Sequence, residues 1–187
     1  MIRLRALEPE DLDLLYTIEN DRRLWHVSNT AAPYSRYALR QYIAEGQTLA
    51  SCGQLRQVIC AADSDRDRAV GLIDLFAYEP KHRRAETAIA LLADERGKGY
   101  GAAALRQLCR EAEHLHHLHT LYAVVGKSNR PGLRLYADAN FACRAVLPDW
   151  IWTGERFESA SVLVRTFGAA KEAPTSVSDA HIPSEKA

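Results

Sequence analysis

The sequence lacks both a long apolar run and an excess of charge of one sign. No stretch approaches the roughly 20 apolar residues that a helix needs to cross a bilayer. Lys and Arg together number 24, against 24 Asp and Glu, so the formal net charge is zero. This balance excludes a strongly basic nucleic-acid binder. We therefore expect neither a membrane nor a nucleic acid as a partner.

The cysteines and histidines lack the spacing of a metal site. Cys52, Cys60, Cys109 and Cys143 are scattered without a C-x-x-C pair, which argues against a zinc knuckle or a disulfide framework. The histidines within 114–119 have pairs at helical spacing, but no carboxylate or cysteine completes a ligand set with them. The first residues also carry no apolar stretch of signal-peptide type. We expect a cytoplasmic protein without a bound metal.

Length and composition fit one folded unit followed by a polar tail. The chain has 187 residues, of which 47% are hydrophobic, enough for a sizeable core. Residues 169–187 have no aromatic side chain, and only Val177 and Ile182 are large and apolar. Such a stretch cannot bury enough surface to offset the entropy of ordering it. The sequence predicts a domain over 1–168 and a disordered tail over 169–187.

Hydrophobic periodicity predicts an α/β (α+β) fold in the order β-α-α-β-β-β-α-β-α-β-β. Ile2 and Leu4 alternate with arginines in a first strand, Pro9 suits the start of a first helix, and Ser35 can cap a second. Polar turns join the central strands as hairpins, so we expect a mixed sheet of about seven strands flanked by about four helices. The later elements are expected as strands at 55–62, 70–78, 84–92, 121–125, 141–147 and 157–167, and as helices at 100–116 and 130–139.

A glycine-rich loop lies between a predicted strand and a predicted helix. Residues 96–101 read RGKGYG, and glycine permits backbone turns that are closed to other residues. The start of a helix presents free N–H groups and the positive end of its dipole. The loop therefore predicts a pyrophosphate site, to which Arg96 and Lys98 add charge. The alternative is a tight strand-to-helix turn without a ligand.

Two other phosphate-binding patterns are excluded. The loop also matches the dinucleotide pattern G-x-G-x-x-A, but that pattern expects an acidic residue about 20 positions later, and residues 120–122 provide none. Residues 126–128 read GKS like the end of a P-loop, but Leu121 stands where the P-loop requires its first glycine.

The segment 84–141 resembles the GNAT superfamily of acetyl-CoA-dependent N-acetyltransferases. RGKGYG matches the family's R/Q-x-x-G-x-G/A loop, and the run NRPGLRLY at 129–136 resembles its N-x-x-(small)-x-x-L-Y segment. The element order over residues 1 to about 167 also fits the GNAT fold. The family usually follows its second motif with Gly-Phe, whereas this chain has Asn140, a residue that tolerates the left-handed conformation.

Within the superfamily the chain looks most similar to the spermidine and ribosomal-protein N-acetyltransferase branch, through its opening RLRALEPEDL and the HRRAE that precedes the central strand. The resemblance implies transfer of an acetyl group from acetyl-CoA to a primary amine, by direct attack in a ternary complex. The implied acceptor is a polyamine, a diamine or another small amine. A protein N-terminal acetyltransferase acting on a peptide amine and a non-catalytic acyl-CoA sensor remain alternatives. A homodimer is also expected.

For acetyl-CoA, the resemblance implies contacts with a strand, a loop and a helix start. In this family the strand at 89–91 bulges and splays from its neighbour, which leaves N–H groups for the ligand. Asn129 is expected to cap its helix and also to contact the ligand. The complete implied set is Ile89, Ala90, Leu91, Arg96, Gly97, Lys98, Gly99, Tyr100, Gly101, Asn129 and Tyr136.

Tyr136 is the candidate general acid. A phenol has a pKa near ~10 and a thiol one near ~8.5, so a tyrosine can protonate a departing thiolate at modest cost. Leu133, Tyr136 and Ala137 also share one helical face. The alternative is therefore a tyrosine that serves only the core.

Glu86 is the candidate general base, and Asp74 is a candidate partner in substrate binding. If Tyr78 pairs with Arg84 across the hairpin, these two carboxylates are diagonal neighbours on one face. They could then hold a cationic amine or take its proton through water. The alternatives are a solvated face or pairing with Arg83 and Arg84.

Tyr34 is a third candidate substrate contact. It lies in or near a loop, as do Trp25, Trp150 and Trp152. The corresponding loops of the family line the acceptor pocket, so the resemblance implies an aromatic wall there. The alternative is ordinary core or rim packing.

Overall fold

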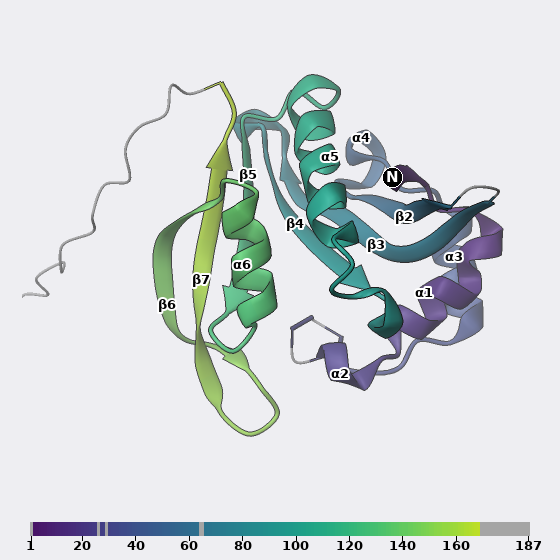
Figure 1. Ribbon diagram of the computed structural model, residues 1–187, viewed down its shortest axis with the longest axis horizontal. Coiled ribbons are helices and arrows are strands. Elements are labelled where there is room, and N and C mark those ends of the chain that lie inside the picture. The colour runs from purple at the N-terminus through teal and green to yellow at the C-terminus, as the bar shows by residue number, and fades with distance from the viewer. Residues whose placement is uncertain (1, 26, 29, 64–65, 169–187) are drawn as a thin grey trace, which may run out of the picture.

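The computed structural model describes residues 2–25, 27–28, 30–63 and 66–168. The tail predicted over 169–187 lies outside the described residues. The strands are β1 (Ile2–Ala6), β2 (Leu55–Asp63), β3 (Arg66–Glu79), β4 (Arg84–Leu91), β5 (Thr120–Gly126), β6 (Ala142–Trp152) and β7 (Phe157–Thr166). They form one seven-stranded sheet in the order β1-β2-β3-β4-β5-β7-β6 (Figure 1). Only the β4–β5 pair is parallel, which confirms the predicted mixed sheet.

The helices are α1 (Leu12–Glu19), α2 (Arg22–Trp25), α3 (Arg36–Ala44), α4 (Leu49–Cys52), α5 (Tyr100–His114) and α6 (Arg130–Asp138). Ser35 caps α3 by accepting from the Ala38 N–H at 3.1 Å, as expected. The prediction of about four helices missed α2 and α4, because one turn is too short to show helical periodicity. Pro9 begins a 3₁₀ turn that precedes α1 rather than α1 itself. No described helix is long and apolar enough to cross a membrane.

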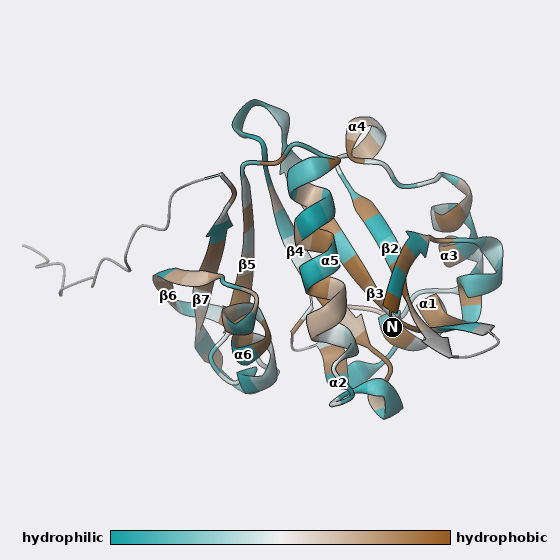
Figure 2. Ribbon diagram, turned by 45° about the horizontal axis from the view of Figure 1, so that its top comes forward, coloured by the Kyte–Doolittle hydropathy of each residue, from teal (hydrophilic) through white to brown (hydrophobic). Residues whose placement is uncertain are grey.

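The helices cover the two faces of the sheet separately. α5 and α6 lie over one face, and α1 and α3 lie over the other (Figure 1). Ile73 and Leu75 of β3 belong to the core under α5, whereas Leu72 of the same strand packs with Leu15 of α1. This follows from the alternation of side chains along a strand, and the strands accordingly change between apolar and polar residues along their length (Figure 2).

β4 and β5 separate halfway along their length. Their parallel pairing extends only from Arg84 with Thr120 to Glu86 with Tyr122. Beyond that point β4 continues to pair with β3 and β5 with β7. A gap therefore opens between the two central strands toward the end of the molecule at which α5 and α6 begin (Figure 1).

The register of the β3–β4 hairpin corrects one expectation and part of another. Phe76 pairs with Glu86 as expected, but Glu79 rather than Tyr78 pairs with Arg84, and the register shifts between Phe76 and Glu79. The β3–β4 register is regular from Phe76 to Gly71, so the bulge expected at 89–91 is absent from it. β4 and β5 therefore splay because their pairing ends after Glu86 and Tyr122, and not because β4 has an extra residue.

Candidate functional site

The glycine loop has the backbone geometry of an anion site. Gly97 and Gly99 have φ values of 76° and 84°, in the left-handed region, and a Cβ on either would meet nothing within 4 Å. Gly99 is the N-cap of α5, and its carbonyl accepts from the Ala103 N–H at 3.1 Å. The N–H groups of residues 100–102 precede this bond and have no intrahelical acceptor. They are free to bind an anion at the positive end of the helix dipole.

Both cations of the loop are held by neighbouring groups. The Nε of Arg96 donates to the carbonyl oxygen of Leu91 at 3.1 Å. The Nζ of Lys98 lies 3.1 Å from Oε2 of Glu95, whose other carboxylate oxygen bonds to Arg68. Hydrogen bonds from Arg68 and Lys98 lower the pKa of Glu95, and the bond from Arg68 has the larger effect. Glu95 therefore offsets the positive charge of Lys98 beside the free N–H groups.

The last residues of β4 turn their peptide groups alternately to β3 and to the gap. The carbonyl oxygen of Thr87 accepts a hydroxyl from α6, so it faces away from β3. The carbonyl oxygen of Ala90 lies so close to β3 that a Cβ on Gly71 would be 2.4 Å from it. By alternation, the peptide groups of Ile89 and Leu91 face the gap. Ile89, Ala90 and Leu91 were all expected to bind acetyl-CoA through their backbone. Ala90 instead directs its peptide groups to β3, so only Ile89 and Leu91 present theirs to the gap.

The start of α5 packs closely on the end of β4. A Cβ on Gly101 would lie 3.5 Å from the Leu91 side chain and 3.7 Å from that of Ile89, which is ordinary contact. Tyr100 is half-buried and packs against the core under α5. The small side chain at 101 therefore brings the helix N-terminus next to the gap.

Tyr136 joins α6 to β4. Its hydroxyl donates to the carbonyl oxygen of Thr87 at 2.9 Å, and its ring meets Phe141 edge-on with centroids 5.1 Å apart. The side chain is buried, and this burial is the largest cause of a raised pKa. The structure thus combines the two alternatives for Tyr136: the ring belongs to the core, and the hydroxyl reaches β4 where β5 departs.

The two asparagines that bracket α6 behave as the sequence predicts. Asn129 caps the helix by accepting from the Gly132 N–H through Oδ1 at 3.0 Å. Asn140 has φ 63° just after the helix, in the left-handed conformation. A Cβ at 132 would lie 2.7 Å from the Asn129 amide, so the glycine at this position makes room for the cap.

Glu86 lies at the base of the gap. It is half-buried, and burial raises its pKa, although hydrogen bonding to the Val124 backbone and the Tyr122 side chain opposes the effect. It makes no ion pair among the described residues. The expected alternative partners are engaged elsewhere, since Arg84 binds Glu79 at 2.8 Å and Arg83 donates to a backbone carbonyl.

Asp74 shares the face of Glu86 but is neutralised by an internal arginine. Both of its carboxylate oxygens accept from Arg56, at 2.7 and 2.9 Å. Arg56 also donates to Glu19 at 2.5 Å and lies over the ring of Tyr42. Asp74 is therefore not placed to bind an amine on its own. Sequence reasoning missed this network because it depends on the pairing of β2 with β3.

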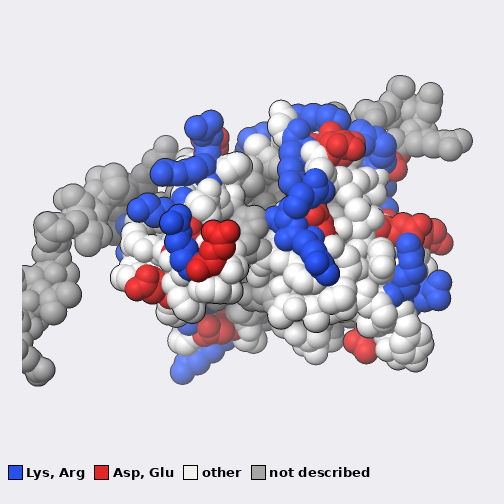
Figure 3. Space-filling model, turned by 90° about the horizontal axis from the view of Figure 1, so that it is seen from below, with Lys and Arg blue, Asp and Glu red and all other residues white. Residues whose placement is uncertain are grey.

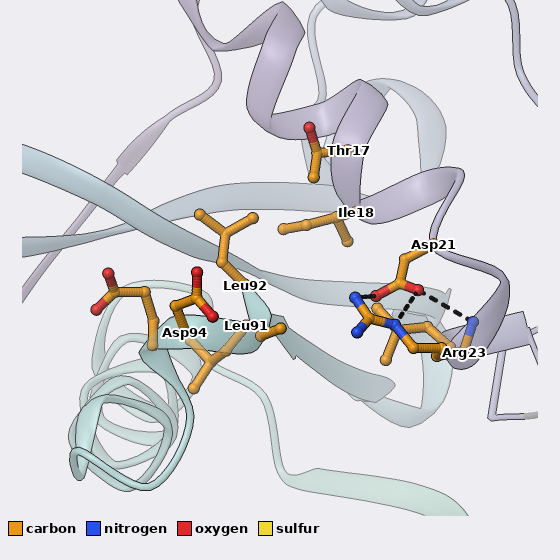
Figure 4. Close-up of a pocket in the computed structure, with 10 residues that line it drawn as sticks. Thr17, Ile18, Asp21, Arg23, Leu91, Leu92 and Asp94 are labelled. Carbon is orange, nitrogen blue, oxygen red and sulfur yellow. Dashed lines mark hydrogen bonds and ion pairs between the residues drawn. The ribbon is translucent and has the colours of Figure 1, made fainter.

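A pocket of about 360 Å³ lies between the end of α1 and the end of β4 (Figure 4). It combines leucine side chains with three carboxylates, those of Asp21, Asp94 and Glu95. Asp21 is bound by Arg23 at 2.8 Å, whereas Asp94 forms no ion pair within the described part of the chain. Tyr34 is 44% exposed and does not line this pocket; the Asn20 side chain holds its backbone at 2.8 and 3.1 Å.

The end of the molecule at which α5 and α6 begin carries several groups of Lys and Arg side chains, with Asp and Glu side chains among them (Figure 3). Lys127, Arg130 and Arg156 line a hollow of about 390 Å³ at the start of α6. Asp149 and Glu158 line the same hollow, and Glu158 accepts from the Ser128 N–H and hydroxyl. Three cations thus face two carboxylates around this hollow, a balance that suits an anionic ligand.

Two curated proteins with the same name are similar to this chain in sequence. Spermidine N(1)-acetyltransferase of Escherichia coli K12 is 24% identical over 162 residues, covering 85% of this chain and 82% of that protein. The enzyme of the same name from Vibrio cholerae serotype O1 is 22% identical over 160 residues, covering 84% and 88%.

Solved structures of the Vibrio cholerae enzyme share the fold. A crystal structure in complex with CoA and spermine superposes with a TM-score of 0.77 at 22% identity, covering 88% of this chain and 95% of that one. A dodecameric structure in an intermediate state gives 0.74 at 23% identity, covering 88% and 93%. The model of the acetyltransferase (GNAT) domain family matches residues 2–142. The chain therefore belongs to the GNAT acetyltransferase family and is an acetyl-CoA-dependent N-acetyltransferase.

Proposed function

We propose that this enzyme acetylates a primary amine of a small cationic acceptor of the polyamine class. The observation that carries the proposal is the gap between β4 and β5. The free N–H groups at the start of α5 lie at its open end, and the half-buried carboxylate of Glu86 lies at its base. The N–H groups thus suit the diphosphate of an acyl donor, and the carboxylate suits the amine of an acceptor, at one and the same gap.

The residues around the gap divide the work of acyl transfer. The loop at 97–102 binds the diphosphate of acetyl-CoA through its N–H groups. The peptide groups of Ile89 and Leu91 align the arm that carries the thioester, and their N–H groups are the available donors for its carbonyl oxygen. Glu86 takes the proton from the amine, since its raised pKa makes it a better base than an exposed glutamate. Tyr136 supplies a proton to the leaving thiolate.

Two observations support a polyamine as the acceptor: the carboxylates of one pocket and the similarity to spermidine acetyltransferases. The pocket beside the end of β4 has three carboxylates, one of them without an ion pair among the described residues. Positively charged nitrogens spaced along an aliphatic chain suit carboxylates interleaved with leucine side chains. The curated relatives named above act on spermidine. A peptide acceptor and a non-catalytic sensor are less favoured, because the relatives named above are named as acetyltransferases of spermidine.

Thiol release from acetyl-CoA tests the proposal across a panel of spermidine, spermine, putrescine, single amino acids and short peptides. We expect turnover with the polyamines and little or none with peptides. Calorimetry with coenzyme A alone serves as the independent check on the donor site. Turnover confined to peptides would contradict the acceptor class, whereas absence of coenzyme A binding would contradict the donor site as well.

A further inference from the structure

Thr87 of β4 has a buried side-chain hydroxyl that takes part in no hydrogen bond among the described residues. The residue is only 2% exposed, and its Oγ1 has no hydrogen-bond partner among the described residues. The only other such side-chain atom in that part of the chain is Oε1 of Gln57, whose amide nitrogen does bond, to Glu111 at 3.1 Å. Buried hydroxyls are normally paired, so an unpaired one calls for an explanation, and one explanation is a partner gained during catalysis.

The position of Thr87 suggests that function. It follows Glu86, the last residue of β4 that pairs with β5, so it is the first β4 residue beside the gap. Its carbonyl oxygen accepts the Tyr136 hydroxyl. The Thr87 side chain also lowers the pKa of Tyr136, in opposition to burial.

The surroundings of Tyr136 make a phenoxide costly. Burial raises the pKa of the phenol most, and three further groups from three packed elements add to it: Glu86 of β4, Cys109 of α5 and Asp74 of β3. The carbonyl of Thr87 can only accept a hydrogen bond and so gives a phenoxide no support. The hydroxyl of Thr87, on the same residue, can donate one.

We propose that Thr87 is a positioning residue whose hydroxyl donates to the phenolic oxygen of Tyr136 while that tyrosine protonates the departing thiolate. The inference rests on the proposed function. In this step the O–H bond of Tyr136 breaks and an S–H bond forms on coenzyme A, so the negative charge passes from sulfur to the phenolic oxygen. The Thr87 hydroxyl keeps its own proton. The phenoxide then regains a proton through solvent from Glu86, which holds the one removed from the amine.

The test separates this role from a merely structural one by using the isosteric Thr87→Val variant. Because the hydroxyl has no hydrogen-bond partner to lose among the described residues, we expect the melting temperature of the variant to equal or exceed that of the wild type. We expect kcat to fall roughly tenfold to a hundredfold, as for loss of one donor to a developing oxyanion. The KM and Kd for acetyl-CoA should stay within about twofold of wild type. Thr87→Ser, which keeps the hydroxyl, should restore most of kcat.

A double-mutant cycle with Tyr136→Phe completes the test. If Thr87 acts through Tyr136, the double variant should be no slower than Tyr136→Phe alone. The inference is overturned if Thr87→Val keeps the wild-type kcat, if Thr87→Ser loses as much as Thr87→Val, or if the two losses multiply. In each of these outcomes the wild type still turns over, so the proposed function stands. A wild type that acetylates no amine overturns both.

Discussion

Lys98 is bound by Glu95 at 3.1 Å, so the cation of the glycine loop carries its own counter-ion. Glu95 comes directly before the loop and also binds Arg68. A diphosphate at the start of α5 would compete with the Glu95 carboxylate for Lys98. The loop is therefore less attractive to an anion than its sequence suggests.

Glu95→Gln should tighten coenzyme A binding. The amide keeps a hydrogen-bond acceptor for Arg68 but removes the negative charge beside the diphosphate. We expect the Kd from calorimetry to fall roughly two- to fivefold, with a steeper dependence on salt. Lys98→Gln is the matched control and should weaken binding. Weaker binding by Glu95→Gln would show that the carboxylate instead holds the loop in its binding conformation.

Tyr136→Phe should separate chemistry from binding. The variant keeps the ring against Phe141 and loses only the hydroxyl that reaches Thr87. We expect kcat to fall roughly a hundredfold or more, the usual contribution of a general acid, and the Kd for acetyl-CoA to change less than about twofold. Unfolding in urea should report a loss of about 1 kcal/mol for the missing hydrogen bond. A wild-type kcat would leave Tyr136 as a core residue only.

Glu86→Gln should change how activity depends on pH. A general base works when deprotonated, so kcat/KM of the wild type should rise as the pH passes upward through the pKa of Glu86. Burial raises that pKa, so the rise should lie above the ordinary glutamate range. The variant should lose both this rise and most of its activity. If the variant kept the rise of kcat/KM with pH, another group would be the general base.

Glu86 should also affect how stability depends on pH. Its pKa is higher in the folded protein than in the unfolded chain, so the folded state binds more protons between the two values. The contribution of Glu86 to the free energy of unfolding therefore falls as the pH rises through that interval. Denaturant unfolding of the wild type and Glu86→Gln across this range should converge at its acidic end and diverge in favour of the variant at its alkaline end.

Gly71→Ala should damage the sheet that supports the donor site. A Cβ at 71 would lie 2.4 Å from the Ala90 carbonyl oxygen, a backbone atom of the neighbouring strand. We expect a loss of about 1–3 kcal/mol in the free energy of unfolding, measured in urea. Gly101→Ala is the matched control. Its Cβ would meet only side-chain atoms at 3.5 Å or more, so we expect stability within about 1 kcal/mol of wild type.

Many elements of the fold and some details of the site could be predicted from the sequence because their signals are local. The caps by Ser35 and Asn129 and the left-handed Asn140 follow from the chemistry of single residues. The glycine loop likewise lies directly before α5, with two of its glycines in the left-handed region. The short α2 and α4 were missed because four residues do not establish a period.

The sequence by itself determined the order of the strands and longer helices and the family, since periodicity and motif spacing are properties of neighbouring residues. Only the tertiary structure decided which charged and polar groups are free. Arg56 neutralises Asp74, Arg68 of β3 binds Glu95, and the Thr87 hydroxyl beside Tyr136 has no hydrogen-bond partner in the described part of the chain. Each of these facts depends on strand register or on packing between segments distant in sequence, because a slip of one residue would turn the side chains of a strand to the opposite face.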